Sequence, residues 1–466
     1  MSDLPETPEN QVPQDGQDGQ SQIDAQLLEA LQDALAQRDG PLLMHMLDGL
    51  HPADASDILE QFSSDDFAEV IALLGDDFSA DVLVELRDEY RADAVEVLSD
   101  EAVTAVLPDL ESDDAAALLE DVEEDRRARI LEDLEPLERA SLEQALDFDE
   151  ETAGRLMQRA FVAAPEFWTV GHTIDHARET GEALPEQFFE IYVVDPGFKV
   201  LGAVPLPLLL RTPREVKLAS IMAEIEAEIS TEMDQEEVAY LFQKYSLASA
   251  PVVDDARRIT GMITVDDMVD VIQEENTEDL LALSGVRSAD GSDTVWDSVK
   301  ARAPWLGVNL FTAFLASGII SIFQPVLSAY VAVAILMPVV AALGGNAGSQ
   351  ALTVTVRAIA EREMEGAAAR RAVLREMLTG LANGLIFAVG VGAVTLLWFG
   401  NMTMAITIAF AILATFVWGG FAGIVVPLSL QRLGVDPAVA SSVFVLTLTD
   451  TMAFFSFLGL ATLVLL

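Results

Sequence analysis

Asp450 is the residue of this 466-residue chain whose type and surroundings most clearly suggest chemistry. It stands in the stretch FVLTLTDTMAFF, where every other residue is apolar or hydroxylated. A carboxylate at the centre of a bilayer costs at least ~2.5–3.5 kcal/mol, so it normally faces a partner or a water-filled path. We expect Asp450 to meet a cation on such a path, with Thr447 among the accompanying hydroxyls. A structural hydrogen bond between helices is the alternative.

A second polar stretch, MPVVAALGGNAGSQALTV, lies in another apolar segment. Pro338 and the pair Gly344 and Gly345 predict a weakened, interrupted helix, and broken helices at membrane depth commonly line aqueous cavities. Asn346 adds an uncharged oxygen to this stretch. Close packing of helices through small residues is the competing interpretation.

The composition restricts which cation is expected. The chain has no Cys and four His, so a thiolate or imidazole cage for a transition metal is not indicated. Mg²⁺ gives up its waters reluctantly and is usually held by one or two carboxylates plus water. One Asp ringed by neutral oxygens suits a mostly hydrated Mg²⁺. In a twofold dimer, two copies of Asp450 would offer two charges to one ion.

Charge divides the chain into two parts. The net charge is -51, from 77 acidic and 26 basic residues. From Pro304 onward acids and bases balance, so the negative excess lies in the first two thirds. This distribution argues against nucleic acid as a partner and favours cations. The N-terminus lacks the basic and apolar regions of a signal peptide, which predicts a cytoplasmic acidic part.

The acidic part contains two internal repeats. Residues 1–22 are expected to be a disordered tail, and residues 23–150 an α-superhelix with a period of about 24 residues. Further on, IYVVDPGFKVLGAV and APVVDDARRITGMI superimpose, which predicts two copies of strand, tight turn, strand and helix over 151–213 and 214–280. A connector (plug-like) helix is expected over 281–304.

The apolar part, 305–466, contains five stretches long enough to cross a membrane. They lie at about 305–323, 329–358, 377–399, 404–430 and 439–464. The arginines fall on one side if the acidic part is inside, which predicts a multi-pass membrane protein with a cytoplasmic N-terminus and an external C-terminus.

The second internal repeat resembles a tandem pair of CBS domains, modules that often bind adenine nucleotides. The second copy continues TVDDMVDVI, in which Thr264 and Asp267 match the family's ribose-binding pattern. The first copy has Pro205 and Leu208 at the matching places. The resemblance therefore implies ATP as a possible ligand of the second copy, while a dimerising scaffold without nucleotide is the alternative.

The whole chain resembles the MgtE family of magnesium channels, through MPVVAALGGNAGSQALTVTVRAIA, LGVDPAVASS and LTLTDTMAFFSFLGLATLVLL. The resemblance implies a multidomain homodimer: a cytosolic α-superhelical domain, tandem α/β CBS domains, a connector helix and a five-helix all-α transmembrane domain. It places Asp450 at the ion-selecting position of a central pore and Asn346 in the family's GGN motif. Two positions depart from the family pattern: Ser328 stands where some members carry Glu, and Ser246 replaces a cytosolic acid.

The same resemblance implies regulatory Mg²⁺ sites between cytosolic domains that close the channel. The matching positions are Glu232, Glu236, Glu274, Glu275, Asp279 and Asp436, with Asp270 as a further candidate. Charge alone supports such a gate, because two carboxylates about 6 Å apart repel by roughly 3 kcal/mol at an effective dielectric of about 20. An acidic surface that only keeps the domain soluble is the alternative.

These observations predict a bacterial inner-membrane Mg²⁺ channel, closed by cytosolic Mg²⁺ and without enzymatic activity. A coupled carrier for divalent cations such as Mg²⁺ and Co²⁺ is the main alternative. A CBS receptor that binds nucleotide without transport is a third.

Overall fold

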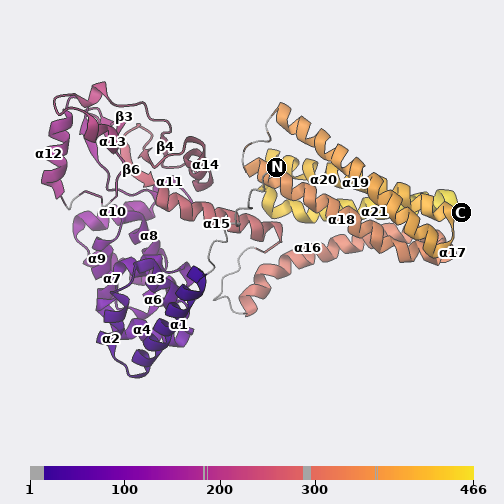
Figure 1. Ribbon diagram of the computed structural model, residues 1–466, viewed down its shortest axis with the longest axis horizontal. Coiled ribbons are helices and arrows are strands. Elements are labelled where there is room, and N and C mark those ends of the chain that lie inside the picture. The colour runs from indigo at the N-terminus through magenta and orange to yellow at the C-terminus, as the bar shows by residue number, and fades with distance from the viewer. Residues whose placement is uncertain are drawn as a thin grey trace, which may run out of the picture. The chain divides into compact units, whose positions relative to one another are not determined.

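The structure is a computed structural model that describes residues 15–181, 184–185, 187–286, 295–360, 362, 364 and 366–466. The chain divides into two compact units, Met1–Val271 and Ile272–Leu466. Figure 1 shows short helices and two small sheets in the first unit, and long helices in the second.

The first unit begins with a series of short helices (Figure 1). Within the described residues they are α1 (Asp15–Ala36), α2 (Gly40–Leu47), α3 (Pro52–Leu59), α4 (Ser64–Leu74), α5 (Ala80–Glu85), α6 (Asp88–Val97), α7 (Asp100–Val106), α8 (Ser112–Glu120), α9 (Glu124–Asp133) and α10 (Pro136–Leu146). The predicted α-superhelical fold of this domain is confirmed. A disordered tail is predicted over residues 1–22. Its predicted end at residue 22 is wrong, because α1 already begins at Asp15. Residues 1–14 lie outside the described part of the chain.

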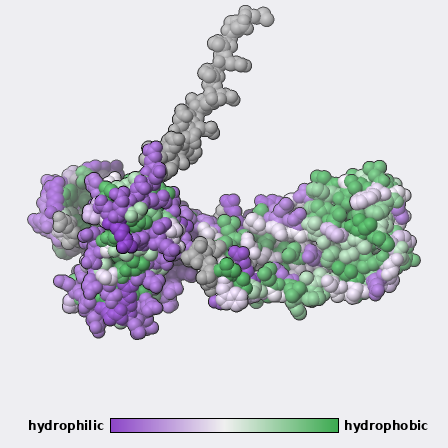
Figure 2. Space-filling model, turned by 90° about the horizontal axis from the view of Figure 1, so that it is seen from below, coloured by the Kyte–Doolittle hydropathy of each residue, from purple (hydrophilic) through white to green (hydrophobic). Residues whose placement is uncertain are grey.

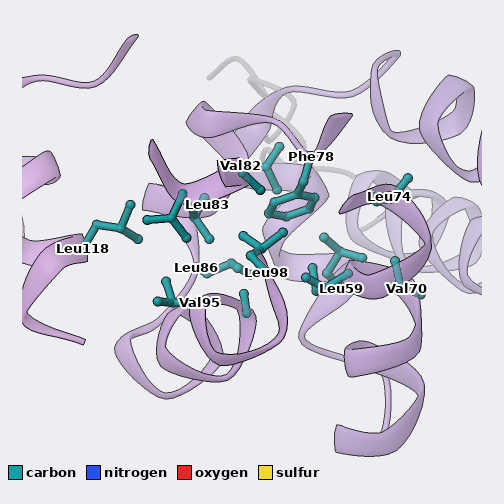
Figure 3. Close-up of a cluster of buried hydrophobic side chains, with 14 of the residues drawn as sticks. Leu59, Val70, Leu74, Phe78, Val82, Leu83, Leu86, Val95, Leu98 and Leu118 are labelled. Atoms are coloured by element: carbon teal, nitrogen blue, oxygen red, sulfur yellow. The ribbon is translucent and has the colours of Figure 1, made fainter. Parts of the chain in front are cut away.

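Local sequence explains where these helices start. Ser63 accepts a hydrogen bond from the Asp66 amide at the start of α4, and Ser99 accepts one from the Ala102 amide at the start of α7. Such caps satisfy amides that have no partner inside the helix. The apolar faces join in one continuous core from Leu31 to Leu142, of which Figure 3 shows a central portion around Leu83 and Leu98.

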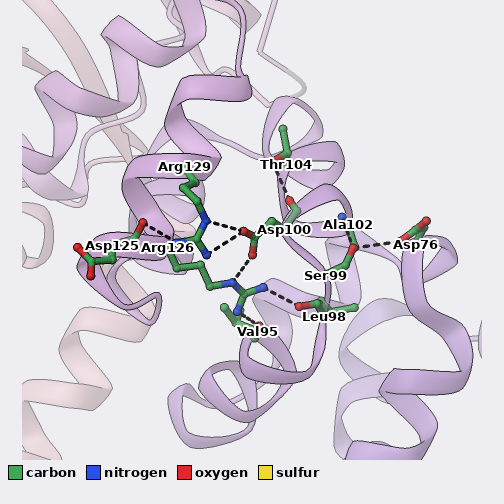
Figure 4. A network of polar contacts seen from close by, with 10 residues as sticks. All are labelled: Asp76, Val95, Leu98, Ser99, Asp100, Ala102, Thr104, Asp125, Arg126 and Arg129. Atoms are coloured by element: carbon green, nitrogen blue, oxygen red, sulfur yellow. Dashed lines mark hydrogen bonds and ion pairs between the residues drawn. The ribbon is translucent and has the colours of Figure 1, made fainter.

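Arginines connect successive helices of this domain. Arg126 of α9 donates to Asp100 at 2.6 Å and to the carbonyls of Val95 and Leu98, both at 2.6 Å, as Figure 4 shows. Arg129 donates to the other oxygen of Asp100 at 3.0 Å. One guanidinium therefore satisfies carbonyls at the end of α6 and holds the start of α7, so that two neighbouring repeats are fixed together.

Two three-stranded sheets follow, with the orders β1-β2-β3 and β4-β5-β6. The elements are α11 (Ala153–Leu156), β1 (Ala163–Pro165), α12 (Val170–Thr180), β2 (Glu190–Val194), β3 (Val200–Pro205), α13 (Leu206–Arg211), β4 (Ile229–Ser230), α14 (Gln235–Tyr245), β5 (Ser249–Val253), β6 (Ile259–Thr264) and α15 (Val265–Leu283). In each sheet the first strand pairs in parallel and the last two are antiparallel.

The predicted repeat is confirmed down to its register. Val193 pairs with Gly202 in the first copy as Val252 pairs with Gly261 in the second, and each register shifts at the next residue. In the first turn the Asp195 carboxylate accepts from the amide of Lys199 at 2.9 Å. The equivalent Asp254 accepts from the amide of Arg258 at 2.9 Å.

The second unit contains the long apolar helices (Figure 1). They are α16 (Val295–Ile322), the short α17 (Gln324–Ala329), α18 (Val331–Ala360), α19 (Ala367–Phe399), α20 (Met402–Arg432) and α21 (Pro437–Leu465). Among the described residues, five of them are long and apolar enough to cross a membrane, as predicted. Figure 2 shows that hydrophobic surface gathers over these helices, whereas hydrophilic surface covers the first unit.

Two local predictions in this unit are wrong. The helix around Gly344 and Gly345 is not interrupted, because α18 runs unbroken from Val331 to Ala360 through Pro338. The predicted boundary between connector and membrane domain at residue 304 falls inside α16, which contains Pro304. A proline removes one intrahelical hydrogen bond but does not have to end a helix. Residues 287–294 of the predicted connector lie outside the described residues.

Two glycines of α18 lie where other membrane helices approach closely. A Cβ at Gly344 would overlap Thr415 of α20, and one at Gly348 would lie 2.8 Å from Thr449 of α21. These positions therefore allow three membrane helices to approach closely, which is the packing interpretation of the small residues.

Candidate cation sites

Three carboxylates from distant parts of the first unit meet beside α8. Glu111 precedes this helix, Asp113 lies in its first turn, and Asp267 comes from the first turn of α15. One oxygen from each can be chosen so that all three lie within 4.8 Å of one another. Three carboxylate oxygens, supplemented by water molecules, form a ligand set that suits Mg²⁺ or Ca²⁺.

Neutral donors complete the surroundings of this group. The Thr264 hydroxyl donates to Asp267 at 2.7 Å. The Gln158 amide donates to Glu111 and, at 3.4 Å, to Asp267. One oxygen of Asp113 is buried and has no hydrogen-bond partner among the described residues. That orphaned oxygen marks where a cation would complete the group, since buried acceptors are normally satisfied.

The electrostatics of the group also favour a cation. Burial raises the pKa of Asp113 well above its ordinary value, and the charges of Asp267, Asp114 and Glu111 add to the effect. Burial likewise raises the pKa of Asp267 to about 6. Each ionised pair at this separation repels by on the order of 3 kcal/mol at an effective dielectric of 20. A bound divalent cation would convert that repulsion into attraction.

More acids lie next to this group. Burial raises the pKa of Asp114; Arg91 partly opposes the effect, while Glu85, Asp266 and Asp270 add to it. Asp270, predicted as a regulatory ligand, therefore lies in the field of Asp114. Burial and Asp266 raise the pKa of Asp270 as well. The acidic surface continues from Asp113 along the first turns of α15.

A separate acidic pair lies in the second unit. Burial raises the pKa of Asp279, and the nearby charges of Asp436 and Glu278 raise it further. Asp436 caps α21, where its carboxylate accepts from the Ala438 amide at 2.8 Å. The structure thus brings together two of the predicted regulatory residues, Asp279 and Asp436, which are far apart in the sequence.

The other predicted regulatory acids occupy different places. Glu232 lies in the turn before α14, and Glu236 lies in the first turn of that helix. Glu274 and Glu275 lie on α15, where Glu274 is exposed and Glu275 is half-buried. These four residues therefore lie on different elements, Glu232 and Glu236 in the first unit and Glu274 and Glu275 in the second.

The candidate ion path lies on α21 and α18. Asp450 is half-buried, and among the described residues it has no hydrogen-bond or ion-pair partner. The hydroxyl of Thr447 donates to the Val443 carbonyl at 2.7 Å, within its own helix. A Cβ on Gly345 would lie 3.4 Å from Leu446, and one on Gly348 would lie 2.8 Å from Thr449. These contacts bring the GGN stretch to the same level as Asp450.

One face of α18 is polar and exposed. Its exposed polar side chains are Asn346, Ser349, Gln350, Thr353 and Arg357. Spacings of three and four residues place them on a single side of the helix. A polar stripe on a membrane helix normally faces water or another protein surface and not lipid.

Reasoning from the sequence missed several acids of these sites. Glu111, Asp113 and Asp114 belong to the repeated ESDD-type helix starts, where acids are expected for capping alone. Glu278 was passed over beside Asp279. The signal that distinguishes Asp113 is burial with unmet hydrogen bonding, which only the folded structure reveals.

Comparisons with known proteins identify the family to which the parts of this chain are similar. A family model described as a divalent cation transporter matches residues 337–460, one for the MgtE intracellular N domain matches 50–151, and one for the CBS domain matches 218–274. The magnesium transporter MgtE of Bacillus subtilis is 30% identical over 327 residues, covering 69% of this chain and 71% of the relative. That of Thermus thermophilus is 34% identical over 331 residues, covering 70% and 72%.

Among solved structures, the cytosolic domain of the Mg²⁺ channel MgtE in complex with ATP is 32% identical. It covers 52% of this chain and 99% of its own, with a TM-score of 0.49. The family matches, together with five described helices long and apolar enough to cross a membrane, define the class of protein: one that joins an MgtE N domain and a CBS domain to a set of long apolar helices. The chain belongs to the MgtE family.

Proposed function

We propose that this protein is a Mg²⁺-selective channel for magnesium uptake, with Asp450 as the carboxylate that attracts the ion. The observation that carries the proposal is the unpartnered Asp450 at the level of the GGN stretch, beside the exposed polar face of α18. The names of the relatives, magnesium transporters, support Mg²⁺ as the ion.

We propose a homodimer on the basis of the same features. In one chain Asp450 has no hydrogen-bond or ion-pair partner among the described residues, and Asn346, Ser349 and Gln350 of α18 are exposed. A twofold axis through this region would place two copies of Asp450 opposite each other, so that two charges and the oxygens of Asn346 surround a hydrated ion. Gly344 and Gly345 then act indirectly, by allowing the helices to pack closely.

The acidic sites supply the regulation. Glu111, Asp113 and Asp267 in the first unit, and Asp279 with Asp436 in the second, would each hold Mg²⁺ when its cytosolic concentration is high. Without the ion their carboxylates repel, which destabilises the compact arrangement of the domains. Swinging a two-state gate from mostly open to mostly closed takes about 5.5 kcal/mol, within reach of several such groups.

The positions of the basic residues support a proposal for the membrane orientation. Arg302, Arg357, Arg371 and Arg432 lie at helix ends that share one side if each long helix crosses the bilayer once. That side would be cytoplasmic by the positive-inside rule. The acidic N-terminal unit would then be in the cytoplasm, the C-terminus outside, and the protein in the inner membrane.

Currents through the purified full-length protein in planar bilayers would test the channel. With Mg²⁺ as the only permeant cation, we expect a current that persists without any proton or sodium gradient, and its loss in Asp450→Asn. A flux that requires a coupling gradient would instead establish the coupled carrier. Thr462→Val is the matched control, because its hydroxyl donates only within its own helix, to Leu458 at 2.8 Å.

A nucleotide is a second candidate ligand of the CBS region. Thr264 and Asp267 match the ribose-binding pattern, and the CBS family model covers this copy. The same Asp267 belongs to the group with Glu111 and Asp113. We propose that ATP, where it binds, acts on the metal site through this shared residue; calorimetry of the full chain with and without Mg²⁺ would measure it.

A further inference from the structure

A cavity of about 310 Å³ opens at the basic end of the second unit. It lies between the residues that end α15, the first turns of α16 and the first turns of α21. Its lining combines one cation with aromatic, amide, hydroxyl and aliphatic groups: Arg302, Trp305, Leu306, Asn309, Ser442 and Leu446. None of these residues is a predicted cation ligand, although Leu446 also lies opposite Gly345.

The polar end of the cavity is positively charged. Arg302 is exposed, and among the described residues no carboxylate pairs with it. The Asn309 amide and the Ser442 hydroxyl are uncharged hydrogen-bonding groups of the same lining. A guanidinium with such neighbours suits the oxygens of a phosphate group.

The other walls of the cavity are apolar. Trp305 packs beside Gly285, whose φ of +74° turns the chain at the end of α15; a Cβ there would lie 3.7 Å from the indole. Farther along α16, Leu306 and Leu310 are 64% and 60% exposed. Only 6% of the apolar window of this helix is buried, so the surface below Arg302 is exposed.

We propose that this cavity binds an anionic phospholipid, with the phosphate at Arg302 and the acyl chains along Leu306 and Leu310. Charge complementarity and the order of groups select this occupant. A cation at the interface, Trp305 at headgroup level and leucines below it follow the polarity of a lipid from head to tail. Basic pockets between membrane helices bind anionic headgroups in this way.

The lipid would also stabilise the end of α15. Leu283 and Gly285 contribute to the cavity, and the adjacent Ala282 packs in one cluster with Val356 and Ala438, from α18 and α21. A headgroup in the cavity would therefore hold this part of the connector against two membrane helices. The inference does not depend on which ion the protein transports.

Native mass spectrometry of the delipidated full-length protein in detergent would test the site. We expect phosphatidylglycerol to be retained and phosphatidylcholine to be retained less. Arg302→Gln should weaken retention of phosphatidylglycerol about fivefold, the contribution of one basic residue near a membrane surface. Arg302→Lys should keep most of it. Arg432→Gln is the matched control, because Arg432 ends α20 and does not line the cavity.

Several results would overturn the proposal. Retention unchanged in Arg302→Gln would remove Arg302 from the site, and an equal loss in Arg432→Gln would mean nonspecific attraction to basic residues. Displacement of the lipid by inorganic phosphate would mean that the site recognises free phosphate and not a lipid.

If Arg302→Gln does not fold, Leu306→Gln tests the apolar wall. Undiminished retention of the lipid in that variant would contradict the acyl-chain placement. Absence of any bound lipid from the wild-type protein would mean that another surface, such as a second copy of the chain, covers the cavity.

Discussion

Asp100 and Asp113 lie in the same acidic domain, thirteen positions apart, and their surroundings are opposite. Asp100 receives hydrogen bonds from Arg126 and Arg129, and the bond from Arg126 is the main cause that holds its pKa below the ordinary value. Asp113 is half-buried beside Glu111 and Asp267, and desolvation raises its pKa. The first carboxylate already has its cations within the chain, whereas the second lacks one.

The difference shows that the acidic residues of this protein have two different roles. Carboxylates with arginine partners join neighbouring repeats, so they are structural. Carboxylates without a partner, such as Asp113 and Asp450, are the positions at which a cation from solution completes the structure. Asp450 extends the comparison into the membrane part, where leaving a carboxylate unpaired costs more.

Replacing Asp450 should have the largest effect. We expect Asp450→Ala and Asp450→Asn to reduce Mg²⁺ transport by about tenfold or more, because no other carboxylate lies deep in a membrane span. The measurement is growth of a Mg²⁺-requiring bacterial strain, with membrane expression checked. Full growth with both variants would mean that Asp450 is structural, and the comparison would then hold only for the acidic domain.

Neutralising Asp113 should shift the response to Mg²⁺. We expect Asp113→Asn to raise the Mg²⁺ concentration that protects the full chain from protease by about tenfold, because the affinity of such sites depends on the number of charged ligands. It should also increase protection without Mg²⁺, since repulsion falls.

Asp65→Asn, at an exposed position in the first turn of α4, provides the control. An equal shift in this control would attribute the Mg²⁺ response to overall charge, and the distinction between paired and unpaired carboxylates would fail.

The setting of Asp450 can be tested through helix packing. A Cβ at Gly348 would lie 2.8 Å from Thr449 and 3.0 Å from Val445, so Gly348→Ala should separate α18 from α21. We expect a loss of about 1–3 kcal/mol in stability, measured as a lower melting temperature in detergent. Gly307→Ala, with no atom within 4 Å of its Cβ, should not show this loss. Equal melting temperatures would mean that the two helices tolerate the extra methyl group.

The smallest effect on transport is expected where the carboxylate is already paired. Arg126→Gln removes charged hydrogen bonds to Asp100 and to two carbonyls, and should destabilise the acidic domain by about 1.5–3 kcal/mol, without change in transport. Thermal unfolding of the full chain measures it. Recovery of the lost stability on adding Mg²⁺ would show that Asp100 binds the ion once Arg126 is removed. Paired and unpaired carboxylates would then differ only in whether an arginine already occupies them.

Local patterns in the sequence determined much of this protein. Apolar stretches set the five long helices, and the matching of IYVVDPGFKVLGAV with APVVDDARRITGMI set two sheets with the same register. Asp450 could be identified from the sequence because a charged residue among apolar neighbours is also a local feature. Each of these features depends on residues within a few positions of one another.

Tertiary structure alone decided which acids meet. Glu111 and Asp267 are separated by more than a hundred positions, and neither differs in sequence context from the many other acids at helix starts. The same holds for Asp279 with Asp436 and for Gly344, whose effect depends on Thr415 of another helix. Burial and unmet hydrogen bonding arise only when separate elements pack together, so no local pattern could have predicted them.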